Sequence, residues 1–111
     1  MLWIEKSFDA YLLSYKSGFM SGSGPLEAQI SCYTQQPWQQ VGRILFFAGD
    51  SVPQNQTYDQ DLPSIHFQLS RFSDVMHILL NEKPLYLRLN TNSFYGDIAT
   101  STELIGEEEP S

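Results

Sequence analysis

Residues 69–90, LSRFSDVMHILLNEKPLYLRLN, contain both kinds of hydrophobic periodicity that decide the fold of this chain. In the first half, apolar residues recur at the helical spacing i, i+3, i+4 and i+7, namely Phe72, Val75, Met76 and Leu79. Pro84 cannot continue a helix, and from Leu85 onward apolar and polar residues alternate as in a half-buried β-strand. The stretch therefore predicts a helix, capped at its start by Ser70 or Ser73, that passes directly into a strand.

Four further strands are expected around this stretch, at Ile4–Tyr15, Leu26–Tyr33, Val41–Gly49 and Phe94–Ile105. The first has apolar residues on both faces, which predicts a strand covered on two sides. The third is β-branched and aromatic, and is the best candidate for a buried central strand. Residues 49–64 are polar and contain two prolines, so we expect a long loop, which in a compact domain is either functional or mobile.

The expected element order is β-β-β-loop-α-β-β. Hairpin-linked strands with one inserted helix indicate an α+β fold, mainly β, in which a curved antiparallel sheet or a partly closed small barrel packs against the helix. The chain has 111 residues, of which 41% are hydrophobic, and this suits a single domain. We expect that domain at residues 1–106, followed by an acidic C-terminal tail at residues 107–111.

Composition and charge exclude several classes of protein. The net charge is −7, and the six basic residues are scattered and never adjacent, so nucleic-acid binding is not expected. The N-terminus has no basic leader followed by an unbroken apolar run, which predicts a cytoplasmic protein without a signal peptide or membrane span. The one cysteine, Cys32, excludes an internal disulfide and lies on the apolar side of its predicted strand.

No group of residues has the spacing of a catalytic or metal site. Cys32, His66 and His77 lack partners at the spacings that nucleophilic dyads or metal ligands need, so no catalytic residue, metal or cofactor is expected. Asp97 is unusual, because aspartate is depleted in strands. Gly96 beside it predicts a β-bulge or a close approach of another part of the backbone.

Two functional hypotheses from different classes remain. A chain with six tyrosines, two tryptophans and only 17% charged residues is typical of a protein that self-associates. The first hypothesis is therefore a non-enzymatic interaction or small regulatory module, acting as a homodimer or with another protein through an aromatic and polar surface. The second is a small-ligand-binding protein or enzyme with a cleft between the sheet and residues 49–64. The candidate ligand-binding residues are His66, Asp97, Asp59, Asp61, Tyr86, Tyr95 and Trp38.

The runs FSDVMHILLNEKPLYLRLN (72–90) and ATSTELIGEEE (99–109) resemble a family of small uncharacterised bacterial proteins. The shared features are a helix that ends in Asn-Glu-Lys-Pro and a C-terminal Ser-Thr-x-x-Glu-x-Ile-Gly-Glu-x-Glu pattern. The resemblance covers about residues 70–109 and implies no activity, cofactor or catalytic residue. For the acidic run Glu107–Glu109 we expect a solvated terminus, or alternatively a patch that contacts Lys83 or Arg88 of this or a neighbouring chain.

Overall fold

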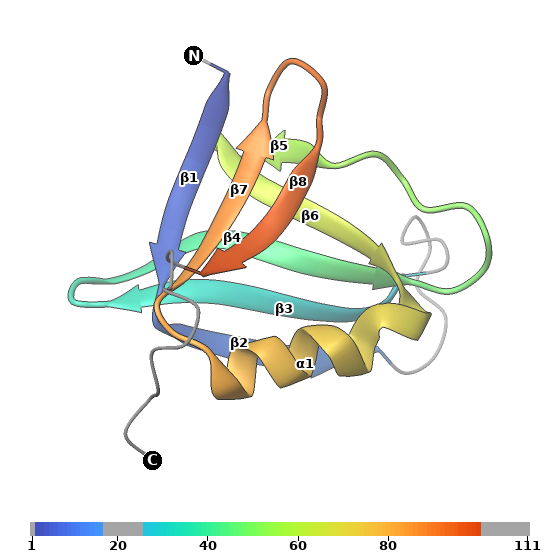
Figure 1. Ribbon diagram of the computed structural model, residues 1–111, viewed down its shortest axis with the longest axis horizontal. Helices are drawn as coiled ribbons and strands as arrows, with labels where there is room; N and C mark the ends of the chain where they lie inside the picture. Colours follow the sequence, from blue (N-terminus) through green and yellow to red (C-terminus); the bar gives the residue numbers. More distant parts are fainter. Residues whose placement is uncertain (1, 17–25, 101–111) are drawn as a thin grey trace, which may run out of the picture.

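The computed structural model describes residues 2–16 and 26–100, which form two β-sheets and one α-helix (Figure 1). The elements are β1 Trp3–Phe8, β2 Ala10–Tyr15, β3 Leu26–Gln35, β4 Trp38–Phe47, β5 Gln56–Tyr58, β6 Leu62–Gln68, the 3-10 turn Leu69–Arg71, α1 Phe72–Asn81, β7 Leu85–Asn90 and β8 Gly96–Thr100. One sheet has the strand order β1-β7-β8 and the other β2-β3-β4-β6-β5. The fold is α+β and mainly β, as predicted, and the strands of the described part do not close into a barrel.

Helix α1 is the helix that the periodicity predicted. Val75 and Leu79 are buried in the core, and Phe72 packs against it with its ring edge-to-face on Phe46. The predicted serine cap is wrong, because Arg71 occupies the N-cap position and no side chain caps the helix. Within residues 2–16 and 26–100, no helix has the length and apolar composition that a bilayer-spanning segment needs.

The first predicted strand is two strands in two different sheets. The chain bends at Asp9, whose backbone N–H donates to the carbonyl of Tyr33 over 3.0 Å. β1 then pairs with β7, whereas β2 forms an edge of the five-stranded sheet. The prediction that this segment is covered on both faces is wrong, because Leu12 and Tyr15 of β2 are exposed.

The pairing of β4 with β6 is parallel, which departs from the antiparallel sheet that was expected. β6 begins at Leu62, inside the predicted loop 49–64, and β5 also lies in that stretch. Parallel neighbours cannot be joined by a tight turn, so the residues between β4 and β6 cross back to the start of the sheet. Pro63 concealed β6 in the sequence, because proline lacks the N–H that an interior strand uses.

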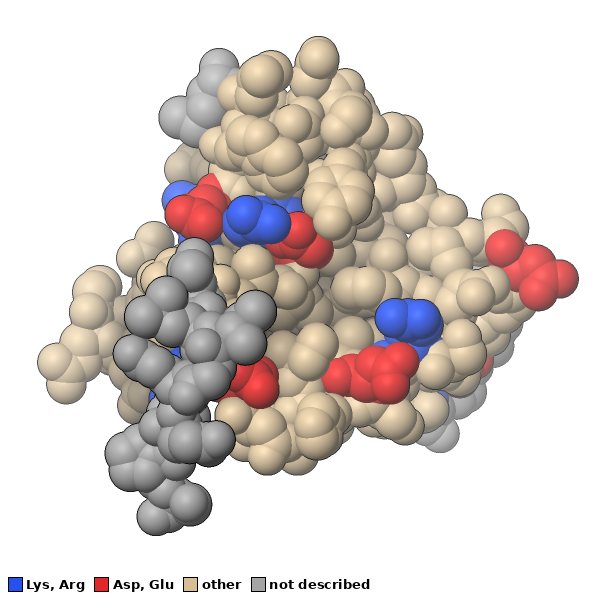
Figure 2. Space-filling view, in the orientation of Figure 1, with Lys and Arg blue, Asp and Glu red and all other residues tan. Residues whose placement is uncertain are grey.

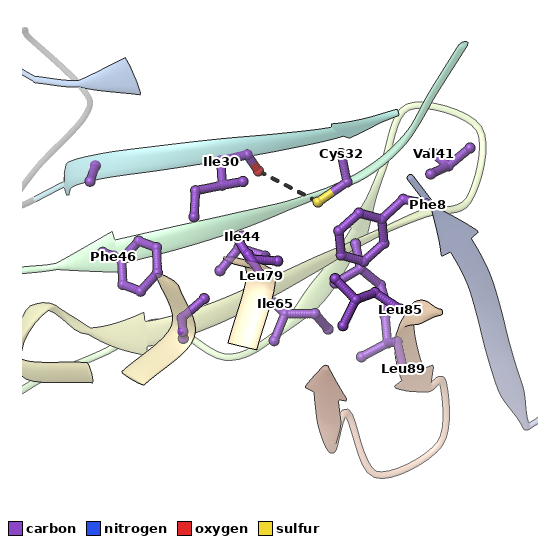
Figure 3. Packing of buried hydrophobic residues seen from close by; sticks show 13 residues of the cluster. Phe8, Ile30, Cys32, Val41, Ile44, Phe46, Ile65, Leu79, Leu85 and Leu89 are labelled. Atoms are coloured by element: carbon purple, nitrogen blue, oxygen red, sulfur yellow. Dashed lines mark hydrogen bonds between the residues drawn. The ribbon is translucent and has the colours of Figure 1, made fainter. Parts of the chain in front are cut away.

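One hydrophobic core lies between the two sheets and α1. Figure 3 shows side chains from β1, β3, β4, β6, α1 and β7 that point into this common interior. Cys32 is fully buried there, as predicted, and burial raises the pKa of its thiol to about 12. The thiol therefore stays protonated and acts as a small apolar side chain.

Two glycines allow the sheets to approach each other closely. A Cβ atom on Gly42 of β4 would lie 2.5 Å from Leu87 Cδ1 and 3.1 Å from the carbonyl oxygen of Pro63. A Cβ atom on Gly96 of β8 would lie 2.5 Å from Ile65 Cδ1. The closest neighbour at Gly96 is therefore the side chain of Ile65, whereas another part of the backbone was predicted. The alternative of a bulge is not found either, since the β7–β8 register runs without a shift.

Substitution of Gly42 by alanine should destabilise the protein by about 1–3 kcal/mol, because the added methyl group overpacks the contact with Leu87. In a Leu87→Val background the same substitution should cost less, since the shortened side chain relieves the clash. Urea unfolding of the four proteins in this double-mutant cycle measures both effects. An equal cost in the two backgrounds would contradict the proposed contact.

Candidate functional site

Figure 1 shows the loop at which β7 turns into β8, at one end of the three-stranded sheet. Four large apolar side chains are exposed at this end. They are Leu2 at 56% exposure, Trp3 at 42%, Phe94 at 36% and Tyr95 at 58%. The Trp3 and Tyr95 rings meet edge-to-face with their centroids 6.2 Å apart, and the Leu2 carbonyl accepts a 2.6 Å hydrogen bond from the N–H of Thr91. We call these four side chains the aromatic tip. Clustered apolar exposure of this kind often marks an interaction site.

Arg88 and Asp97 support the tip from the exposed face of the same sheet. Arg88 donates two hydrogen bonds to the Asp97 carboxylate, of 2.8 and 2.7 Å, and its guanidinium lies 5.5 Å from the centre of the Trp3 ring. These bonds raise the pKa of Arg88 further above its already high value. Figure 2 shows charged side chains of both signs together over this sheet. The unusual aspartate in a strand is explained, because it pairs with a cation directly across the hairpin.

The β7–β8 hairpin loop holds Phe94 in a disfavoured backbone conformation. The side-chain oxygen of Asn90 accepts hydrogen bonds from the N–H groups of Asn92 and Ser93, each 2.9 Å, which closes the loop. Phe94 follows with φ +62°, and its N–H donates to the carbonyl of Asn90 over 2.8 Å. Strain at a bulky exposed residue is not explained by core packing, and such strain is concentrated at functional positions.

Asn55 connects this loop to the other sheet. Its side-chain nitrogen donates to the carbonyl of Phe94 over 3.1 Å, and its side-chain oxygen accepts from the backbone N–H of His66 over 2.7 Å. One amide side chain therefore fixes the hairpin loop relative to β6. The aromatic tip is held in place by Arg88 on one side and by Asn55 on the other.

His66 is the centre of a directional hydrogen-bond network on the face of the five-stranded sheet that lies under residues 53–55. Its Nδ1 lies 3.0 Å from the carbonyl oxygen of Pro53, which can only accept, so Nδ1 carries a proton. Arg43 Nε donates to Ser64 Oγ over 2.8 Å, and Ser64 Oγ lies 2.8 Å from His66 Nε2. Because burial lowers the pKa of His66, the imidazole is neutral, and its Nε2 then accepts a hydrogen bond from the Ser64 hydroxyl.

This serine–histidine pair has the spacing of a catalytic dyad but lacks access for a substrate. Ser64 is fully buried, and its oxygen already accepts a hydrogen bond from Arg43. Burial lowers the pKa of His66, and the nearby charge of Arg43 lowers it further, against an opposing effect of the hydrogen bond to Pro53. The network binds residues 53–55 to the sheet.

The seven candidate residues fall into separate places. Tyr95 is part of the aromatic tip, and Asp97 supports the tip through Arg88. Tyr86 is half-buried on the same face of β7 as Arg88. Asp59 and Asp61 lie in the turn between β5 and β6, where both adopt positive φ values, a conformation that aspartate tolerates better than most residues. Trp38 opens β4 and stacks on Tyr33, while His66 lies in β6.

The acidic run Glu107–Glu109 lies outside the described residues. Of its two proposed contacts, Arg88 is bound to Asp97. Lys83 is exposed and lines a groove of about 750 Å³ at the C-terminal end of α1. Among the described residues, no three histidine, cysteine, aspartate or glutamate side chains are close enough together to hold a metal ion. No family model, curated protein sequence or solved structure matches the chain.

The functional candidates that were not among the predicted ligand-binding residues are Leu2, Trp3, Arg88 and Phe94. Their exposure depends on the pairing of β1 with β7, which joins residues about 85 positions apart in the chain. Arg88 and Asp97 lie on two strands of one predicted hairpin, but only the register of the hairpin decides whether they face each other.

Replacement of Asp97 by asparagine should lower the free energy of unfolding by about 1 kcal/mol, because Arg88 loses a charged bidentate partner. Asp74→Asn is the matched control, since Asp74 forms only an exposed pair with Arg71 at 3.6 Å and should contribute less than about 0.5 kcal/mol. Chemical unfolding of both variants checks this. Equal losses would show that the Arg88 pair has no special role.

The His66 network predicts a loss of stability in mild acid. Because the pKa of His66 is lowered from 6.5 in the folded state, the unfolded chain binds a proton at higher pH than the folded chain does. The contribution of His66 to the free energy of unfolding is therefore complete above about pH 6.5 and is lost as the pH falls through the pKa of His66 in the folded state. Thermal unfolding at several pH values should show a smaller decrease for His66→Gln and an unchanged decrease for His77→Gln, the exposed histidine. An unchanged decrease for His66→Gln together with a smaller decrease for His77→Gln would contradict the network.

Proposed function

We propose that this chain is a non-enzymatic interaction module that binds through the aromatic tip. The observation that carries the proposal is the clustering of four exposed apolar side chains, two at the start of β1 and two on the β7–β8 loop, whose position is fixed by hydrogen bonds. Tryptophan, tyrosine and arginine are the residues that most often dominate binding energy at protein interfaces. A surface that is already ordered loses little conformational entropy when it binds.

The partner that fits this surface best is a second copy of the chain. The chain carries a net charge of −7, but residues 2–3 and 89–96, which build the tip, are all uncharged. Two copies can therefore meet tip to tip without bringing like charges into contact. A two-fold contact of this kind uses the same patch on both subunits, and about 1,000 Å² or more of total buried surface makes it stable. We place the module in the cytoplasm, since its one cysteine is a buried thiol.

Trp3→Ala and Tyr95→Ala should each weaken dimerisation at least about tenfold, because each removes a large side chain from the centre of the contact. Sedimentation velocity over a range of protein concentrations measures the monomer–dimer equilibrium. Trp38→Ala is the control, since Trp38 is 64% exposed but lies on the other sheet.

A wild-type protein that remains monomeric at every concentration would overturn the homodimer. Equal weakening by Trp38→Ala would show that general surface hydrophobicity, and not the aromatic tip, drives association. Circular dichroism of each variant separates loss of binding from loss of folding.

A further inference from the structure

A second surface, which shares no residue with the aromatic tip, has the composition of a binding site. A hollow of about 500 Å³ lies beside the start of β4 and the turn between β5 and β6. It is lined by Lys6, Gln39, Gln40, Asp59, Gln60 and Leu62. The hollow thus contains three amide side chains, one carboxylate, one ammonium group and a single wholly apolar residue.

Most of these polar groups are free to bind a ligand. Within the described part of the chain, the side chains of Lys6, Gln39, Asp59 and Gln60 form no hydrogen bond or ion pair. Gln40 donates one hydrogen bond, of 2.7 Å, to the hydroxyl of Tyr58, which leaves its carbonyl oxygen as an acceptor. Polar side chains elsewhere on this sheet, such as Arg43 and His66, are engaged in the network described above.

The lining selects the chemical class of the ligand. Lys6 and Asp59 have opposite charges, so the hollow as a whole does not favour an anion such as a phosphate or a carboxylate, for which paired arginines are usual. Leu62 alone gives too little apolar surface for a lipid or another hydrophobic ligand. Three amides that both donate and accept hydrogen bonds fit a neutral molecule with many hydroxyl groups.

Trp38 precedes two lining residues of the hollow, Gln39 and Gln40, in β4, and it carries a flat apolar ring. Its ring stacks on Tyr33, with the centroids 4.6 Å apart and the planes 13° from parallel, yet the residue is 64% exposed. One face of the indole is therefore covered and the other is open to solvent. The negative face of an aromatic ring attracts the weakly positive C–H groups of a ligand. Gln40 follows on the same side of β4, about 6.8 Å along the strand.

We propose that this surface binds a neutral oligosaccharide, with one sugar ring against the open face of Trp38. The hydroxyl groups of the next ring are bound by Gln39, Gln40, Gln60 and Asp59 in the hollow. The site is independent of the aromatic tip and of dimerisation through it. Its ligand contacts come from side chains that have no role in the hydrogen bonding of the fold, apart from the one bond of Gln40.

Tryptophan fluorescence tests the proposal directly, because the chain contains only two tryptophans and Trp3→Phe leaves Trp38 as the sole reporter. This variant is titrated with cellohexaose, maltohexaose, mannohexaose and chitohexaose. At least one should produce a saturable change in emission. Asp59→Asn and Gln60→Ala should each raise the dissociation constant at least about fivefold, through loss of hydrogen bonds to hydroxyl groups. Gln54→Ala, an exposed glutamine outside the hollow, should leave it unchanged.

A second measurement follows the wild-type protein by NMR, in which the side-chain amide signals of Gln39 and Gln60 should shift with the same saccharide. The proposal is overturned if none of the four saccharides binds at about 10 mM, a concentration at which even a very weak site fills. It is also overturned if Asp59→Asn and Gln60→Ala bind as tightly as the parent. A response of Trp38 to a polyproline peptide but to no saccharide would assign the surface to protein partners instead.

Discussion

The two sheets pack so closely that neither Gly42 nor Gly96 leaves room for a β-carbon, and the rest of the structure depends on this contact. Leu87 fits against Gly42, and Ile65 fits against Gly96, so β7 and β8 are held directly over β4 and β6. The position of Gly96 also sets where the β7–β8 hairpin begins. Only at this separation does the single side chain of Asn55 reach both His66 and Phe94. The exposed aromatic tip is thus a consequence of the packing beneath it.

The parts of the fold that follow from local sequence were predicted, and those that follow from pairing between distant segments were not. α1 and β7 were predicted because their periodicities are contained within the segments themselves. The division of the first strand at Asp9 depends on which distant strand each half joins, and no local pattern records that choice. The parallel pairing of β6 was hidden for the same reason and also by Pro63, a residue typical of loops.

The candidate site shows how sensitive such predictions are to register. A turn confined to residues 91–93 would place Arg88 opposite Gly96, whereas the observed loop includes Phe94 and places Arg88 opposite Asp97. A shift of one residue moves every side chain to the other face of a strand, so the ion pair could not be derived from the composition of the hairpin. The extra residue is Phe94 itself, which enters the loop with a positive φ and thereby completes both the pairing and the exposed surface.

In this protein, the residues whose types are typical of catalytic sites form a hydrogen-bond network that stabilises the fold. His66, Ser64 and Arg43 have the chemistry of a catalytic centre, but they form hydrogen bonds to one another, and His66 binds Pro53 and so holds residues 53–55 on the sheet. The side chains that keep exposed apolar surface or free hydrogen-bonding groups are of types less typical of catalytic sites. They are the exposed rings of the tip and the amides of the hollow. Burying a polar network is costly unless every member is satisfied, so a satisfied buried network accounts for its own presence through stability. The exposed apolar cluster at the tip and the hollow of largely unpaired amides add nothing comparable to stability, which is why we propose a binding role for each.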